Sequence, residues 1–179
     1  MSRADRDRWD TAYADRPLPE SITAPAEFAP FADMFPTTGT GLDLACGQGA
    51  LSVWLARGGV TMRGVDVSPV AVNRARDLAR RDGVAERCRF EVADLDDGLP
   101  PGDPADVVVC YRFWDPWLSA AITARLAPGG LLAICALSEV GAGPGRYRVR
   151  TGELPAAFPG LRIAAAGEAD GVAWMLATK

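Results

Sequence analysis

Three aspartates stand at the ends of successive apolar, strand-like runs of this 179-residue sequence. Asp43 comes just before the Gly-containing turn 45-ACGQG-49, Asp66 follows the next run, and Asp94 follows the third. In an open α/β sheet, ligands bind outside the carboxyl ends of the strands. Carboxylates there accept hydrogen bonds from hydroxyl and amine groups and attract cations. The three together suit a ligand with a ribose, an amine-bearing base and a positive charge.

The turn itself has two interpretations. A dinucleotide loop needs G-x-G-x-x-G, and Gly47 and Gly49 are followed by Ser52 where the third glycine would stand. Asp43 would also repel a pyrophosphate, whereas it attracts a cationic ligand. A nicotinamide-dependent oxidoreductase therefore remains the less favoured alternative. A second alternative is a module that keeps the cofactor-binding fold but catalyses no reaction.

The elements that must position these aspartates alternate regularly from Gly41 onward. Strands are predicted over 42–45, 60–65, 88–93, 106–111 and 130–137, and helices over 49–58, 69–83 and 116–130. This rhythm predicts right-handed crossovers and a parallel sheet. After a Gly-rich loop, a short helix (151–158) precedes strands 160–168 and 171–179. The Asp170-Gly171 dipeptide between them predicts an antiparallel hairpin.

Residues 1–16 are predicted to form a helix with Trp9 and Tyr13 on one face, and a second short helix follows within 26–35. The expected organisation is a single domain over 1–179, with a helical cap segment (1–38) and a sheet (39–179). Whether Trp9 and Tyr13 form a lid or only dock the helix is left open by the sequence.

Composition excludes several functions. A net charge of −4 argues against a nucleic-acid partner. The sequence has no histidine, which excludes His-ligated metal sites and a His general base, and no metal is expected. Four cysteines without a C-x-x-C pair are expected to be reduced and mostly buried. With no signal peptide or apolar span, a cytoplasmic location without a membrane partner is expected.

Taken together, 43-DLACGQG-49, 64-GVDVS-68, 92-VADL-95, 106-DVVVCYRFW-114 and 126-LAPGGLL-132 resemble the class I S-adenosylmethionine-dependent methyltransferases in order and spacing. The resemblance covers about residues 40–179. It implies a Rossmann-like α/β fold with a mostly parallel seven-stranded sheet, order 3-2-1-4-5-7-6, an antiparallel last strand and helices on both faces. It also implies S-adenosyl-L-methionine as cofactor.

By this resemblance, the glycines of the turn approach the methionine part of the cofactor and Asp43 lies near its ammonium group. Asp66 would hold both ribose hydroxyls, Val67 would pack on the adenine, and Asp94 would accept from the adenine amine. The Cys110 carbonyl would bind the methionine amine. The implied cofactor residues are Asp43, Ala45, Cys46, Gly47, Gly49, Asp66, Val67, Asp94, Leu95 and Cys110; Ala45 stands where many members have glycine.

The substrate implied is a small molecule. The stretch 111-YRFWDP-116 lacks the N/D-P-P-Y/F pattern of the branch that methylates amides and exocyclic amines. Together with 9-WDTAY-13 and 146-RYRVRTGEL-154, it is similar to small tellurite-resistance-type and thiopurine-type methyltransferases. A thiolate, selenide or telluride would need no general base. An oxygen nucleophile would, and Tyr111, Asp115 and Glu139 are the base candidates.

The candidate catalytic residues are Tyr111, Arg112 and Glu139, and the candidate substrate residues are Trp9, Tyr13, Tyr111, Arg112, Trp114, Arg146 and Tyr147. Trp117 is a further candidate, for which packing in the core of an amphipathic helix is the favoured interpretation. The alternating Arg146, Arg148 and Arg150 are expected to line a solvated strand edge, or else to bind an anionic substrate. The protein is expected to be a monomer or homodimer.

Overall fold

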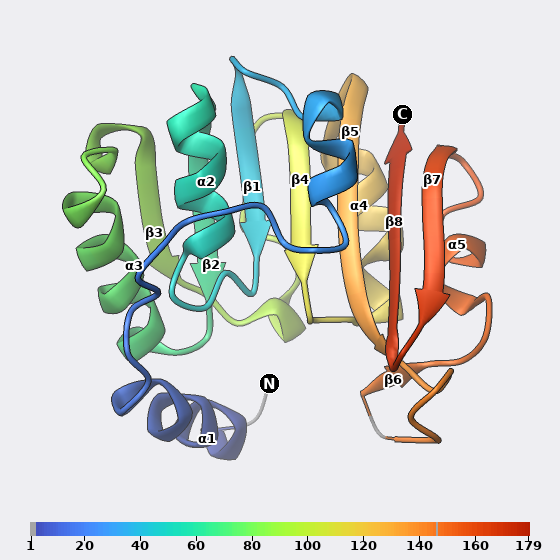
Figure 1. The fold of residues 1–179 in the computed structure, drawn as a ribbon, viewed down its shortest axis with the longest axis horizontal. Helices are drawn as coiled ribbons and strands as arrows, with labels where there is room; N and C mark the ends of the chain where they lie inside the picture. The colour runs from blue at the N-terminus through green and yellow to red at the C-terminus, as the bar shows by residue number, and fades with distance from the viewer. Residues whose placement is uncertain (1–2, 146) are drawn as a thin grey trace. The chain divides into compact units, whose positions relative to one another are not determined.

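The computed structural model describes residues 3–145 and 147–179. It divides into two compact units, one ending at Pro100 and one running from Pro101 to Lys179. The expectation of a single domain over 1–179 stays a prediction. The predicted fold class is confirmed, because both units consist of sheet strands flanked by helices, in the Rossmann-like manner (Figure 1).

The first unit contains a three-stranded parallel sheet in the order β3-β2-β1. Asp43 of β1 lies beside Gly64, and Asp66 of β2 lies beside Val92, so both aspartates are near the carboxyl ends of their strands. The elements are α1 (Arg3–Ala14), η1 (Ala29–Met34), β1 (Thr40–Leu44), α2 (Ala50–Gly58), β2 (Thr61–Asp66), α3 (Pro69–Arg81), η2 (Ala85–Arg87), β3 (Cys88–Val92) and η3 (Leu95–Asp97).

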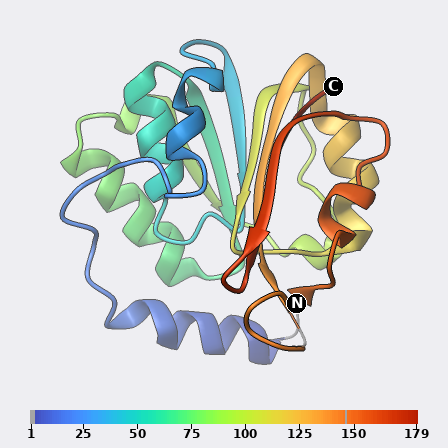
Figure 2. The same cartoon turned by 45° about the vertical axis from the view of Figure 1, so that its right-hand side comes forward.

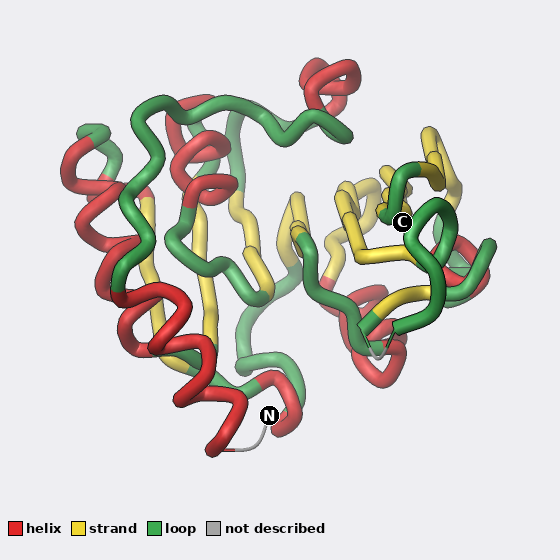
Figure 3. The backbone as a smooth tube through the Cα atoms, turned by 60° about the horizontal axis from the view of Figure 1, so that its bottom comes forward, coloured by secondary structure: helices red, strands yellow, loops and turns green. Residues whose placement is uncertain are grey.

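Local sequence explains where the first unit's helices begin. The Ser68 side chain accepts a hydrogen bond from Ala71 N at 3.1 Å, and Pro69 is the first residue of α3. Helices α2 and α3 contact each other and pack against the sheet through an apolar core centred on Val53, Val72 and Phe90 (Figure 1). The chain that leads out of α1 runs across the outer side of these helices (Figure 2). Figure 3 shows α1 beside α3.

The second unit has the strand order β4-β5-β8-β7, with β8 antiparallel to both of its neighbours. The predicted hairpin is confirmed, because Asp170 and Gly171 both have positive φ (52° and 81°), as a primed turn requires. The elements are β4 (Ala105–Tyr111), η4 (Pro116–Leu118), α4 (Ser119–Arg125), β5 (Leu126–Ser138), β6 (Arg148–Val149), α5 (Glu153–Ala156), β7 (Arg162–Ala169) and β8 (Val172–Thr178).

Two details differ from the sequence prediction. The expected Gly-rich loop contains a two-residue strand, β6, which pairs in parallel with β5, so the strands number eight among the described residues rather than seven. The helix expected over 116–130 ends at Arg125, because Leu126 is extended (φ −69°, ψ 134°) and begins β5. Proline at 128 disfavours helical backbone at the preceding residue, so the helix could not have continued.

No helix within residues 3–145 and 147–179 is long and apolar enough to cross a membrane.

Candidate active site

Asp66 joins two turns of the first unit. Its Oδ2 accepts a hydrogen bond from Gly47 N at 2.8 Å, and its Oδ1 accepts one from Ser68 N at 2.9 Å. Burial raises the pKa of Asp66, while these N–H donors act in the opposite direction. A carboxylate has about four acceptor positions, and the N–H groups of Gly47 and Ser68, together with that of Val67, do not use all of them. Asp66 therefore both holds the turn in place and can accept hydroxyl groups.

Asp43 is buried, with only 2% of its surface exposed. Ser52 Oγ donates a hydrogen bond to its Oδ2 at 2.6 Å. Burial nevertheless raises the pKa of Asp43 to about 7, and the neighbouring Asp66 adds to the effect. The sequence analysis treated Ser52 only as a missing glycine. Its position in the first turn of α2 makes it the partner of Asp43.

The turn between these aspartates depends on residues with left-handed backbone. Ala45, Gly47 and Gly49 have φ of 54°, 53° and 77°. A Cβ on Gly49 would lie 2.8 Å from Ala75 Cβ and 2.9 Å from Phe90 Cζ, so this glycine lets the turn pack against the core. Ala45 adopts the same backbone region although it carries a Cβ, which costs about 1–2 kcal/mol.

The remaining cofactor candidates of this unit differ in exposure. Cys46 is partly buried, and burial raises the pKa of its thiol well above the usual range, so it is not a thiolate near neutral pH. Val67 and Leu95 are buried. Asp94 accepts a hydrogen bond from Asp96 N at 3.0 Å and caps η3, which is a structural role.

Helix α1 brings one predicted residue directly to the turn. The Tyr13 hydroxyl lies 2.6 Å from where a Cβ on Gly47 would be. Burial and then the Asp66 carboxylate raise the pKa of Tyr13 to about 12. Trp9 stacks on Tyr13 with 5.9 Å between ring centroids and is more exposed. Sequence reasoning missed Asp10, which contacts Ser68, because no local pattern connects residues so far apart in the chain.

The second unit carries the candidates that follow β4. Cys110 is buried, and its thiol donates a hydrogen bond to the Phe113 carbonyl oxygen at 3.2 Å. Arg112 has a left-handed backbone (φ 61°), and its N donates to Cys135 O at 2.7 Å. Its guanidinium carbon lies 5.6 Å from the centroid of the Tyr111 ring. Residues in strained backbone regions cluster at functional sites, which makes Arg112 a stronger candidate than sequence alone did.

The other candidates of the second unit are Trp114, Glu139, Arg146 and Tyr147. The ring of Trp114 lies 6.0 Å from that of Phe158. Tyr147 is 47% exposed, and Glu139 is half-buried, with its backbone N donating to Val149 O at 3.0 Å. Arg146 lies outside the described residues.

Two interpretations of side chains in the second unit were wrong. Trp117 was expected in the core, yet it is 91% exposed, because Asp115 caps a separate 3-10 turn there and Leu118 is the residue that turns inward. Arg148 does not lie on a solvated edge. Its Nη1 donates to Ser138 O at 2.6 Å and to Gly171 O at 3.2 Å, and these bonds fix the segment around β6.

A Rossmann-like sheet with an aspartate that bonds the turn after β1 defines an enzyme of the nucleoside-cofactor-binding class. The family model described as a methyltransferase domain matches residues 42–130. Ribosomal protein L11 methyltransferase of Aliivibrio salmonicida is 37% identical over 98 residues, a match that covers 53% of this chain and 32% of that protein. The chain thus spans about a third of the length of the relatives it matches.

Solved structures agree in fold. An S-adenosylmethionine-dependent methyltransferase from Mesorhizobium loti has a TM-score of 0.74 at 18% identity, over 89% of this chain and 100% of that one. TehB from Haemophilus influenzae has a TM-score of 0.76 at 17% identity, over 97% of this chain and 66% of that one. These matches confirm the resemblance to the class I S-adenosylmethionine-dependent methyltransferases noted from the sequence, and S-adenosylmethionine is the cofactor that this resemblance implies.

Proposed function

We propose that this methyltransferase transfers the methyl group of S-adenosylmethionine to a small molecule, and that the strand ends of the first unit hold the cofactor. The observation that carries the cofactor assignment is the Asp66 carboxylate, which is fixed by Gly47 N and Ser68 N. Fixed in this way, it can accept both ribose hydroxyls without first reorganising. Asp94, Val67 and the Leu95 backbone complete the adenosine end of the proposed site.

Asp43 suits the cationic end of the cofactor. A buried carboxylate whose pKa is raised to about 7 gains most from a ligand that brings a positive charge, because the charge offsets its desolvation. The left-handed turn at Ala45, Gly47 and Gly49 lets the amino-acid part of the cofactor approach the backbone closely. The Cys110 carbonyl is proposed as a further acceptor for the methionine amine.

The acceptor is proposed to be a soft nucleophile of sulfur, selenium or tellurium, with an oxygen nucleophile as the second choice. In methyl transfer the nucleophile's electron pair forms a bond to the methyl carbon as the carbon–sulfonium bond breaks, and S-adenosylhomocysteine leaves with that electron pair. The protein mainly aligns the two reactants. Asp115 is already engaged as the cap of η4, and the sequence has no histidine, which leaves few groups to act as a base.

The residues proposed to meet the acceptor are aromatic or cationic, namely Tyr111, Arg112, Trp114, Arg146 and Tyr147, with Trp9 and Tyr13 from α1. An aromatic and guanidinium lining favours a planar or anionic small molecule. Glu139 and Tyr111 remain the proposed bases if the acceptor is an oxygen. We propose further that the enzyme works in the cytoplasm as a monomer or homodimer, without nucleic-acid or membrane partners, in keeping with its net charge of −4.

Calorimetric titration with S-adenosylmethionine and S-adenosylhomocysteine tests the cofactor site. Wild type is compared with Asp66→Ala and with the control Asp103→Ala, which removes an exposed carboxylate from the second unit. We expect binding by wild type and control and at least tenfold weaker binding by Asp66→Ala, because charge-assisted hydrogen bonds contribute about 1.5–3 kcal/mol each. Equal binding by all three proteins would contradict the assignment of Asp66.

The acceptor is tested by S-adenosylhomocysteine formation with small thiols, a selenide, a telluride and phenols, each with and without enzyme. We expect turnover with a thiol or chalcogen compound. Turnover confined to a ribosomal protein substrate, the kind of acceptor named for the A. salmonicida relative, would overturn the small-molecule proposal while keeping the cofactor assignment.

A further inference from the structure

One face of α1 is turned toward the cofactor end of the first unit. Asp10 and Tyr13, three residues apart, are half-buried, whereas Asp7, Thr11 and Ala12 around them are exposed. Helix α1 lies past the carboxyl ends of β1 and β2 in Figures 1 and 2. A helix that merely docked on the core would present apolar side chains to it, but this one presents a carboxylate and a phenol.

Asp10 binds the turn that follows β2. Its Oδ1 accepts a hydrogen bond from Ser68 Oγ and another from Val70 N at 3.3 Å. Ser68 in turn donates its backbone N–H to Asp66 Oδ1. Helix α1 is therefore connected, through a single intervening residue, to the carboxylate proposed to hold the ribose.

Tyr13 covers the turn that follows β1. With its hydroxyl 2.6 Å from the position of a Cβ on Gly47, it fills the space on the side-chain side of this glycine. Burial and then the nearby Asp66 carboxylate raise the pKa of this hydroxyl. The phenol is uncharged near neutral pH, since its pKa is raised to about 12.

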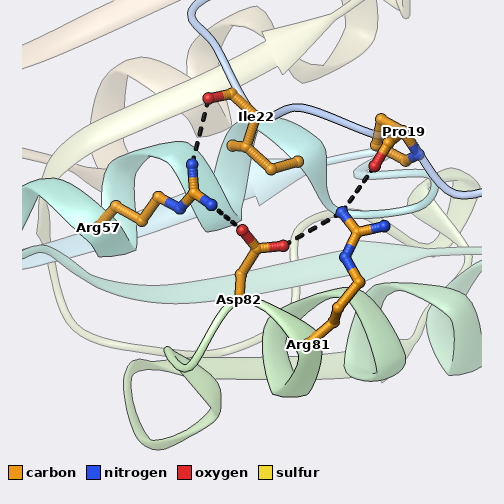
Figure 4. Close-up of polar contacts among 5 residues, drawn as sticks. All are labelled: Pro19, Ile22, Arg57, Arg81 and Asp82. Carbon is orange, nitrogen blue, oxygen red and sulfur yellow. Dashed lines mark hydrogen bonds and ion pairs between the residues drawn. The ribbon is translucent and has the colours of Figure 1, made fainter.

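The chain directly after α1 is anchored independently of these two contacts. Backbone carbonyls accept hydrogen bonds from Gln48 Nε2 (to Arg16 O, 2.9 Å), Arg81 Nη2 (to Pro19 O, 2.6 Å) and Arg57 Nη1 (to Ile22 O, 3.3 Å), and Arg74 binds Ala14 O. Asp82 binds both Arg57 and Arg81, as Figure 4 shows. Ile22 is also part of the core. The anchored segment 14–22 provides a fixed base from which α1 can move.

We propose that α1 is a gate on the cofactor site, with Asp10 as its latch and Tyr13 as the plug over Gly47. This inference rests on the proposed function. In the closed form the plug and the cofactor compete for the same side of Gly47. The cofactor then binds only the open form, so its apparent dissociation constant is the intrinsic constant divided by the open fraction. Weakening the latch must therefore speed association and tighten binding.

Stopped-flow fluorescence with S-adenosylhomocysteine tests the gate. In wild type we expect the observed rate to level off as the ligand concentration rises, because opening limits association. In Asp10→Ala we expect roughly tenfold faster association at low ligand concentration, as the loss of a charge-assisted hydrogen bond predicts, with an unchanged dissociation rate. Asp7→Ala removes the same charge from the exposed side of α1 and serves as the matched control, expected to behave as wild type.

Tyr13→Phe provides a second variant that keeps the ring on Trp9 and removes only the hydroxyl over Gly47. It is expected to speed association in the same direction as Asp10→Ala, and circular dichroism of each variant checks that the fold is intact. Unchanged association rates in both variants, or faster dissociation with weaker binding, would overturn the gate and make Tyr13 a contact of the bound cofactor. Absence of binding in every protein, wild type included, would instead refute the proposed function.

Discussion

Replacing Asp43 with asparagine should change how the stability of the ligand-free protein depends on pH. Burial raises the pKa of Asp43 from 3.8 to about 7, so the folded state holds this proton more strongly than the unfolded state does. Between those two pH values the folded state binds more protons. The free energy of unfolding must therefore fall as pH rises through this window and become independent of Asp43 above about pH 7.

The magnitude follows from the two pKa values. A shift of about three units corresponds to about 4 kcal/mol of destabilisation when Asp43 is ionised in both states. At pH 5, where the folded carboxyl is still protonated, the linkage relation gives about 1.5 kcal/mol. The contribution of Asp43 should therefore grow by about 2.5 kcal/mol between pH 5 and pH 8.

Urea unfolding at pH 5, 6, 7 and 8 measures this contribution as the difference between Asp43→Asn and wild type. We expect the variant to gain on wild type by about 2.5 kcal/mol across the range. An asparagine oxygen can still accept from Ser52 Oγ, and any penalty from its amide hydrogens is independent of pH. The raised pKa of Asp66 affects both proteins and largely cancels.

Asp103→Asn serves as the control, because it removes an exposed carboxylate and should reproduce the wild-type pH dependence. If the difference between Asp43→Asn and wild type stayed constant from pH 5 to pH 8, the desolvation argument for Asp43 would be refuted.

Three further results are expected from the same turn. Cofactor binding at pH 7 should release part of a proton from Asp43. The binding enthalpies measured by calorimetry in two buffers of different ionisation heat should therefore differ for wild type but agree for Asp43→Asn. Equal enthalpies for wild type would contradict this. Gly49→Ala should destabilise the protein by about 2–4 kcal/mol in urea unfolding, since its Cβ would overlap Ala75 and Phe90 at positive φ; a loss below about 1 kcal/mol would contradict the packing. Ala45→Gly should stabilise the protein by about 0.5–1 kcal/mol, because relief of the left-handed strain exceeds the extra chain entropy, and a lower melting temperature would refute that.

Local signals were sufficient for the part of the fold that carries the proposed cofactor site. Glycines at turns, the Ser68-Pro69 helix start and unbroken apolar runs each depend on residues close together in sequence, and they placed the three aspartates at strand ends correctly. The two-residue β6 escaped prediction because so short a strand has no periodicity, and its pairing with β5 depends on tertiary contacts such as the bonds of Arg148.

An error in one predicted helix boundary placed the side chain of Trp117 in the core, whereas it lies at the surface. Treating 116–130 as one amphipathic helix placed Trp117 on its apolar stripe. In the structure Asp115 caps a separate 3-10 turn, which changes the residues per turn and leaves Trp117 exposed while Leu118 is buried. The side-chain oxygen of Asp115 accepts a hydrogen bond from Trp117 N. An acidic residue before a proline, as Asp115 is in the sequence, could have indicated this separate turn.

The contacts of Asp10 with the turn after β2 could not be predicted, because Asp10 and Ser68 are 58 residues apart and neither is unusual in its local context. They change the electrostatics of the site. Burial raises the pKa of Asp66 and Asp10 raises it further, while Asp66 in turn adds to the raised pKa of Asp43. The site is thus a set of carboxylates held together by N–H donors and a serine hydroxyl, with Asp43 protonated below about pH 7.

A cationic cofactor replaces the proton in that arrangement, so its effect on stability must depend on pH. Near pH 6 Asp43 is largely protonated and the ligand's charge gains little from it, whereas at pH 8 the charge offsets the full desolvation of the carboxylate. The rise in melting temperature caused by a fixed, saturating concentration of S-adenosylhomocysteine, which keeps the ammonium group, should therefore be larger at pH 8 than at pH 6. Asp43→Asn should show the same rise at both pH values. A wild-type rise that is independent of pH would mean that the ammonium group is bound by groups other than Asp43.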